Sequence, residues 1–141
     1  MLNAQRILDN AWESIQSLTV NEGSWTSNWL AAITGLRSVG HVLDKEDGVD
    51  PVANKIISEH WDQWENEYLF IELNSLRNNL LKEGNGYPEH DVNYYGEHDE
   101  CIVVQITLED GNDGIDFLKD VANWLQEELD EIEQEIENFS E

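Results

Sequence analysis

The strongest constraint on this fold lies in the C-terminal segment, where an apolar residue recurs at every third or fourth position from residue 115 to residue 139. Such spacing places the apolar side chains in one narrow seam along an α-helix. The seam comprises Ile115, Leu118, Ala122, Leu125, Leu129, Ile132, Ile136 and Phe139. A helix of this kind must bury its seam, either against other helices of the chain or against a second copy. We favour burial within the chain, as in a helical bundle.

Four segments nearer the N-terminus also show helical spacing of apolar residues. They predict helices over residues 2–18, 24–46, 53–66 and 67–84. Ser24 and Asp50 are the expected N-caps, and Pro51 suits the first helical position that follows. Gly84 is the expected C-cap of the fourth helix. Gly35 and Gly40 lie inside the second helix, where glycine is unfavourable, so we expect another element to pack closely there.

Residues between the fourth and last helices predict a loop followed by one strand. The loop is rich in Gly, aromatic and charged residues, whereas the segment CIVVQITL at 101–108 is apolar and β-branched. This strand must pair either with VNYY at 92–95 or with the same strand of a second subunit. The predicted fold is therefore mainly α: one domain over residues 1–141, an antiparallel four- to five-helix bundle with a short strand or hairpin before the C-terminal helix.

The chain is strongly acidic, with 7 Lys and Arg against 31 Asp and Glu and a formal net charge of −24. This charge argues against direct nucleic-acid binding, which depends on basic residues, and favours a basic protein partner. It is typical of a solvated surface or of a high-salt protein, and alternatively of a nucleic-acid mimic. The candidate acidic partner-binding face lies on the last helix and comprises Glu127, Glu128, Asp130, Glu131, Glu133, Glu135 and Glu137.

The cysteine count and the absence of long apolar runs indicate the cellular compartment. A single cysteine, Cys101, excludes an internal disulfide and fits a reducing environment. The sequence shows neither a signal-peptide pattern nor an apolar run long enough to span a membrane. We therefore expect a cytoplasmic protein with no membrane association.

Residues 30–84 contain a series of short motifs in a recognisable order: Arg37-Ser38-Val39, Lys45-Glu46, Asp50-Pro51, Arg77-Asn78 and Glu83-Gly84. In this order and spacing they resemble the HEPN superfamily of helical-bundle proteins. The resemblance implies a HEPN-like domain, a homodimer, and a bacterial or phage toxin–antitoxin or defence setting. Active members are metal-independent RNases whose motif is Arg, a polar residue, three further residues and His.

The RNase motif is degenerate in this chain. Arg77 and Asn78 match it, but Lys82 stands at the His position. An ordinary lysine stays protonated near neutral pH and is a poor general base. We therefore assign no catalytic residue and favour a non-catalytic binding or regulatory module. An acidic nucleic-acid mimic that inhibits a DNA- or RNA-binding enzyme, and a residual metal-independent RNase, remain alternatives.

Arg37, Arg77, Asn78 and Lys82 are the candidate ligand-binding or dimer-interface residues. Arg77 either makes structural contacts to acidic neighbours and carbonyls at a helix–helix contact or belongs to a phosphate or nucleotide pocket with Arg37. We favour the structural interpretation. Arg37 lies in the middle of a predicted helix among apolar residues, where it is a second inward-facing cation.

The remaining chemistry-bearing residues suggest no metal site and no cofactor. His90 and His98 are separated by seven residues in a predicted solvated turn, unlike the closer ligand pairs of zinc sites. Cys101 begins the strand and is expected to be a buried, inert thiol. His41 and His60 are predicted packing or surface histidines. The six tryptophans lie at helical spacing and are expected in the core, with Trp61 and Trp64 able to edge a pocket.

Overall fold

The computed structural model describes residues 1–83 and 87–140, without the side chains of residues 82, 83 and 140. The described part is mainly α, as predicted. Its helices are α1 (Asn3–Thr19), α2 (Trp25–Lys45), α3 (Pro51–Trp64), α4 (Tyr68–Glu83) and α5 (Gly114–Ser140), with a short 3-10 turn, η1 (Asp47–Val49), before α3. Strands β1 (Glu89–Tyr95) and β2 (Cys101–Thr107) precede α5.

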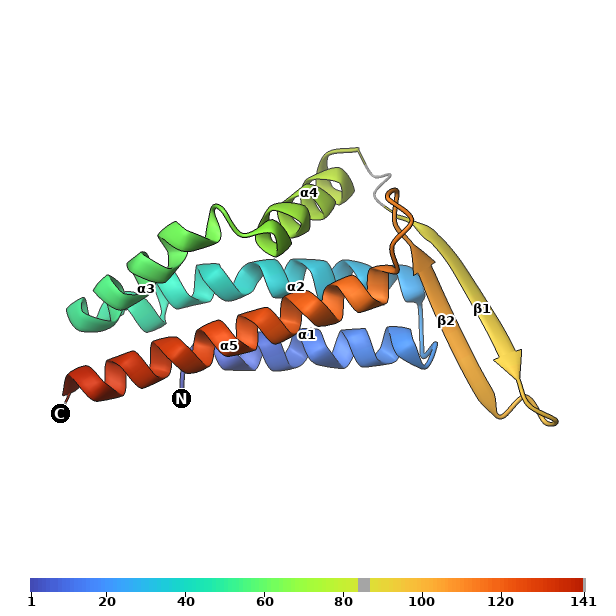
Figure 1. Ribbon diagram of the computed structural model, residues 1–141, viewed down its shortest axis with the longest axis horizontal. Coiled ribbons are helices and arrows are strands. Elements are labelled where there is room, and N and C mark those ends of the chain that lie inside the picture. The colour runs from blue at the N-terminus through green and yellow to red at the C-terminus, as the bar shows by residue number, and fades with distance from the viewer. Residues whose placement is uncertain (84–86, 141) are drawn as a thin grey trace.

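The bundle is built around α1, α2 and α5, which lie side by side along its length (Figure 1). α3 packs against α5, and α4 packs mainly against α2. The hairpin of β1 and β2 stands at one end of the bundle, where β2 contacts the first part of α5. Within the described residues, no helix is both long and apolar enough to cross a bilayer.

The predicted helix starts are confirmed. The Ser24 hydroxyl accepts a hydrogen bond from the backbone N–H of Ser27, and the Asp50 carboxylate accepts two from Val52 and Ala53. Both side chains satisfy N–H groups that have no partner within the helix. Pro51 occupies the first position of α3, where its missing N–H costs nothing. The expected C-cap, Gly84, lies outside the described residues.

The apolar seam of α5 is buried within the chain, as we favoured, over most of its length. Every seam residue from Ile115 to Ile132 is buried, and Val121, outside the predicted seam, is buried with them. The prediction fails at the C-terminal end, where Phe139 is 69% exposed. α5 is longer than the helices it packs against, and its C-terminal end extends beyond the N-terminal end of α1 (Figure 1).

Close helix packing explains both glycines in α2. A Cβ built on Gly35 would lie 3.2 Å from the Cβ of Ala11 on α1. A Cβ on Gly40 would overlap the ring of Trp61 on α3. Trp61 therefore leaves no room for a larger side chain at residue 40, whereas at residue 35 the approach of α1 is tight.

The strand predicted at residues 101–108 pairs within the chain. β1 and β2 are antiparallel, with Val92 opposite Val104 and Tyr95 opposite Cys101. This confirms the first of the two predicted pairings. β1 is longer than the predicted partner at 92–95 and begins at Glu89, in residues expected to form a loop, where exposed polar residues alternate with partly buried ones.

Cys101 is exposed, and its prediction as a buried thiol was wrong. Successive side chains of a strand point to opposite faces. Val104 and Ile106 lie on the face of β2 that packs against the bundle, whereas Cys101 and Val103 lie on the other face. The apolar composition of the strand concealed this alternation.

Candidate functional site

A groove of about 980 Å³ lies where α4, the base of the hairpin and the first turns of α5 meet. One wall is formed by one side of α4, including Tyr68, Glu72 and Leu76. The opposite wall runs from Thr107 through the turn after β2 to Asp120. Sequence reasoning missed this site, because it joins three segments whose acidic residues looked like ordinary surface.

The described residues of the groove carry negative charge only. They include seven carboxylates and no Lys, Arg or His side chain, and these acids are Glu72, Glu89, Glu109, Asp110, Asp113, Asp116 and Asp120. Two of the seven carboxylates accept hydrogen bonds from nearby backbone N–H groups. Asp110 accepts a hydrogen bond from the backbone N–H of Asn112, and Asp113 accepts one from that of Ile115 at the start of α5. The other five form no ion pair or hydrogen bond with any described residue.

Apolar side chains alternate with these acids in the groove. Leu69, Leu76, Leu108 and Phe117 are partly buried and pack against the core, and each also lines the groove. Tyr68 is 59% exposed at its edge. The described surface of the groove therefore combines apolar contact area with negative charge.

Arg77 lies near enough to Arg37 for its positive charge to act on the Arg37 guanidinium. Arg37 on α2 is half-buried, and its guanidinium carbon lies 5.0 Å from the ring centroid of Phe70 and 5.7 Å from that of Trp61. Burial lowers the pKa of Arg37, and the nearby positive charge of Arg77 lowers it further.

The expectation that Arg77 bonds to acidic neighbours and carbonyls was wrong for the described residues, among which it has no ion-pair or hydrogen-bond partner. Arg37 has none either, and its Nε is buried without a partner. Arg37 stacks on aromatic rings instead, where the ring faces attract a cation. Asn78 is exposed on α4, and the Lys82 side chain lies outside the described residues.

Arg37 also lines a small pocket of about 340 Å³ between α2 and α3. His41, Ser58 and Trp61 line it with Arg37, and Asp44 and Asp62 contribute carboxylates. Of the two tryptophans that could edge a pocket, Trp61 does so, whereas Trp64 is buried in the core. Trp61, Trp64, Phe70 and Trp124 form an aromatic cluster behind it, with ring centroids 5.2 to 6.3 Å apart.

The predicted acidic face of α5 is not uniform. Glu127, Asp130, Glu131 and Glu137 are exposed, but the Glu128 side chain is only 13% exposed and turns toward α3. Glu128 and Glu135 both lie within hydrogen-bonding distance of His60. Two acids of this face therefore already contact a residue of the same chain.

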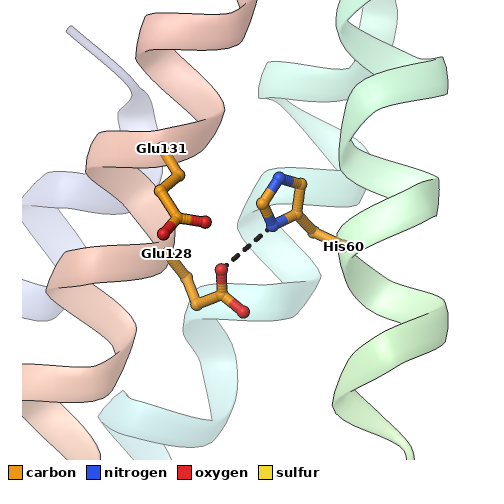
Figure 2. Close-up of side chains that lie close together, drawn as sticks. All are labelled: His60, Glu128 and Glu131. Carbon is orange, nitrogen blue, oxygen red and sulfur yellow. Dashed lines mark hydrogen bonds and ion pairs between the residues drawn. The ribbon is translucent and has the colours of Figure 1, made fainter.

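His60 is buried on α3, 7% exposed, and both of its ring nitrogens face carboxylates of α5. Figure 2 shows Glu128 and Glu131 directed toward the ring from the facing helix. The prediction of a packing histidine missed these polar contacts. His90 stacks against Trp25, with ring centroids 4.5 Å apart, and its Nε2 is buried without a described partner.

No protein-family model, curated protein or solved structure matches this chain.

Proposed function

We propose that this chain is a non-catalytic, HEPN-like binding module that takes up a basic, partly apolar segment of another protein in the groove between α4, the hairpin base and α5. The observation that carries the proposal is the composition of this groove, whose described lining contains seven carboxylates, no basic side chain and several apolar side chains. The toxin–antitoxin or defence setting implied by the HEPN resemblance is part of the proposal.

The chemistry of the groove specifies the partner. Carboxylates facing one cavity attract Lys and Arg side chains and accelerate encounter, but exposed charge pairs add little affinity by themselves. Burial of apolar side chains against Leu76 and Phe117 would supply the larger part of the affinity. An amphipathic basic segment satisfies both requirements, whereas a nucleic acid satisfies neither.

The nucleic-acid-mimic alternative predicts a different binding surface. It depends on the carboxylates of residues 127–137, and two of these acids, Glu128 and Glu135, already contact His60. The groove acids Glu72 and Asp116 have no such contact among the described residues. The groove therefore offers a better supported partner site than the C-terminal face.

A labelled synthetic peptide of alternating Lys and Leu residues tests the proposal, with an oligolysine of equal charge as the comparison ligand. We expect the amphipathic peptide to bind more tightly than oligolysine. The double variant Glu72→Gln/Asp116→Asn should weaken its binding at least tenfold, and Tyr68→Ser should weaken it as well. Fluorescence anisotropy at two salt concentrations measures both effects.

The matched control removes the same charge elsewhere, as Glu127→Gln/Glu137→Gln on the exposed face of α5. This control should change the affinity less than twofold. Equal losses in the two double variants would show non-specific attraction to an acidic protein and would overturn the groove proposal. Greater loss in the control would support the C-terminal face as a nucleic-acid mimic.

A second function is favoured by the environment of Arg37. Its pocket holds a half-buried guanidinium with a buried, unpartnered Nε, next to a second cation, in a chain with few cations. We propose that this pocket can bind a small phosphate-bearing ligand, with Trp61 available for stacking. NMR titration with AMP should shift the Trp61 indole signal, and Arg37→Met should abolish the shift while Arg6→Met on α1 leaves it unchanged.

A further inference from the structure

His60 joins α3 to α5 through carboxylates on both sides of its ring. Nδ1 lies 3.0 Å from Oε2 of Glu128, and Nε2 lies 3.2 Å from Oε2 of Glu135. Glu131, one turn after Glu128 on α5, directs its carboxylate toward the same space (Figure 2). One ligand atom from each of His60, Glu128 and Glu131 lies within 4.8 Å of the other two.

The atoms around this space are arranged as in a metal site. Ligands bound about 2.1 Å from one metal ion lie roughly 3 Å apart, which is the separation of His60 Nδ1 and Glu128 Oε2. Metal-bound histidines donate their second N–H to a carboxylate or carbonyl. Glu135 occupies that position beside Nε2.

Glu128 is likewise oriented by a residue that is not one of the possible metal ligands. The indole N–H of Trp64 donates to Oε1 of Glu128 at 2.8 Å, so that Oε2 is the oxygen directed at His60. His60 and Glu128 are therefore each oriented by a second partner, Glu135 for His60 and Trp64 for Glu128, that a metal ion would not displace. An ordinary surface cluster of acids has no such support.

The charge of the cluster also favours a cation. Glu128, Glu131 and Glu135 converge on a single histidine, and no described Lys or Arg forms an ion pair with any of them. The Glu128 carboxylate is only 13% exposed, and when His60 is neutral no described cation compensates this charge, which is unfavourable for a largely buried carboxylate. A divalent ion between His60 and the two nearer carboxylates would compensate this charge.

We propose that His60, Glu128 and Glu131 bind a divalent transition-metal ion of the Zn²⁺ or Mn²⁺ class. Nδ1 of His60, Oε2 of Glu128 and the Glu131 carboxylate are the protein ligands, and water completes the coordination. Glu135 and Trp64 are positioning residues. Glu131 is exposed, so the ion reaches the site from solvent. The bound ion joins α3 to α5 and strengthens that helix contact.

Isothermal titration calorimetry with ZnCl₂ tests the proposal on the full chain carrying Cys101→Ser, which removes the exposed thiol as a competing ligand. We expect one Zn²⁺ ion per chain and a higher midpoint of thermal unfolding in its presence. Mg²⁺ at the same concentration is the control for non-specific binding of a divalent cation to an acidic protein, and it should bind at least a hundredfold more weakly.

Glu131→Gln is the informative variant, because its side chain is exposed and the fold does not depend on it. We expect at least a tenfold loss of Zn²⁺ affinity. Glu137→Gln, an equal loss of charge on the same helix, should retain wild-type affinity. In the long-range ¹H–¹⁵N spectrum of the histidine ring, Zn²⁺ should shift the Nδ1 signal of His60.

Equal Zn²⁺ affinity in Glu131→Gln and Glu137→Gln would overturn the proposal, as would Zn²⁺ binding no tighter than that of Mg²⁺. An unchanged His60 ring spectrum at saturating Zn²⁺ would do the same. In each case His60 would remain a hydrogen-bonded link between the two helices. These outcomes are independent of peptide binding in the groove.

Discussion

The indole N–H of Trp64 on α3 donates a hydrogen bond to Glu128 on α5, with 2.8 Å between Nε1 and Oε1. The two residues are 64 positions apart in the sequence. Trp64 is 1% exposed, so this hydrogen bond links the two helices from a buried indole.

Replacing Trp64 by Phe tests this link. The variant keeps an aromatic ring in the core but leaves Glu128 without its indole donor, which should lower the free energy of unfolding by about 1–3 kcal/mol. Urea denaturation measures the change. Trp124→Phe is the matched control, because Trp124 belongs to the same aromatic cluster and its indole has no described hydrogen-bond partner. Equal losses would mean that ring volume, and not the hydrogen bond, determines the effect.

Gly40 and Gly35 should respond differently to alanine. A Cβ at residue 40 would overlap Trp61, whose ring is held by Trp64 and Phe70. Gly40→Ala should therefore destabilise the protein by about 1–3 kcal/mol. At residue 35 the nearest atom, the Cβ of Ala11, is 3.2 Å away, and the improved helix propensity should offset part of the crowding. Thermal unfolding of both variants should place Gly40→Ala lower, and the reverse order would contradict the packing seen around Trp61.

The turn of the hairpin contains a carboxylate with a lowered pKa. Glu100 accepts hydrogen bonds from its own backbone N–H and from that of His98, and these lower its pKa below the ordinary value. A lowered pKa means that the carboxylate stabilises the turn above the ordinary Glu pKa, and that this contribution is lost as pH falls through the lowered value. An NMR titration should give a lower midpoint for Glu100 in the protein than in a peptide of residues 96–101. Equal midpoints would contradict the hydrogen-bonded turn.

The assignment as a non-catalytic module predicts that purified protein does not cleave RNA in metal-free buffer. Arg77 lies beside Arg37, but the residue at the expected His position is Lys82, which cannot act as a general base near neutral pH with an ordinary pKa. Wild type and Arg77→Ala should leave a mixed RNA substrate equally intact on a denaturing gel. Cleavage by the wild type that disappears in Arg77→Ala would establish the RNase alternative.

A homodimer remains a prediction from the HEPN resemblance, and sedimentation equilibrium tests it directly. The hairpin offers an accessible surface for such contact, since Tyr95 and Val103 are about half exposed. If the dimer forms there, Val103→Lys should shift the equilibrium toward monomer. A Val103→Thr control, which is β-branched but adds no charge, should shift it less. A monomer at all concentrations would contradict the homodimer prediction.

Local sequence was sufficient for much of the fold. The helical ranges, the caps at Ser24 and Asp50, and the buried seam from Ile115 to Ile132 all depend on residues a few positions apart. Periodicity and capping express short-range physics, which the sequence displays directly. Strand β1 was predicted only at residues 92–95, and only as one of two possible partners, because its acidic and polar residues resemble a loop and its pairing with β2 is a longer-range contact.

The candidate sites, by contrast, were decided by tertiary structure. His60 looked like an isolated helical histidine because Glu128 is 68 positions away, and the groove acids come from three separate segments. The sequence determined how many carboxylates the chain carries, but not which of them share a cavity or face a histidine. Those relationships depend on how the helices pack, because packing sets the distances between side chains that are far apart along the chain.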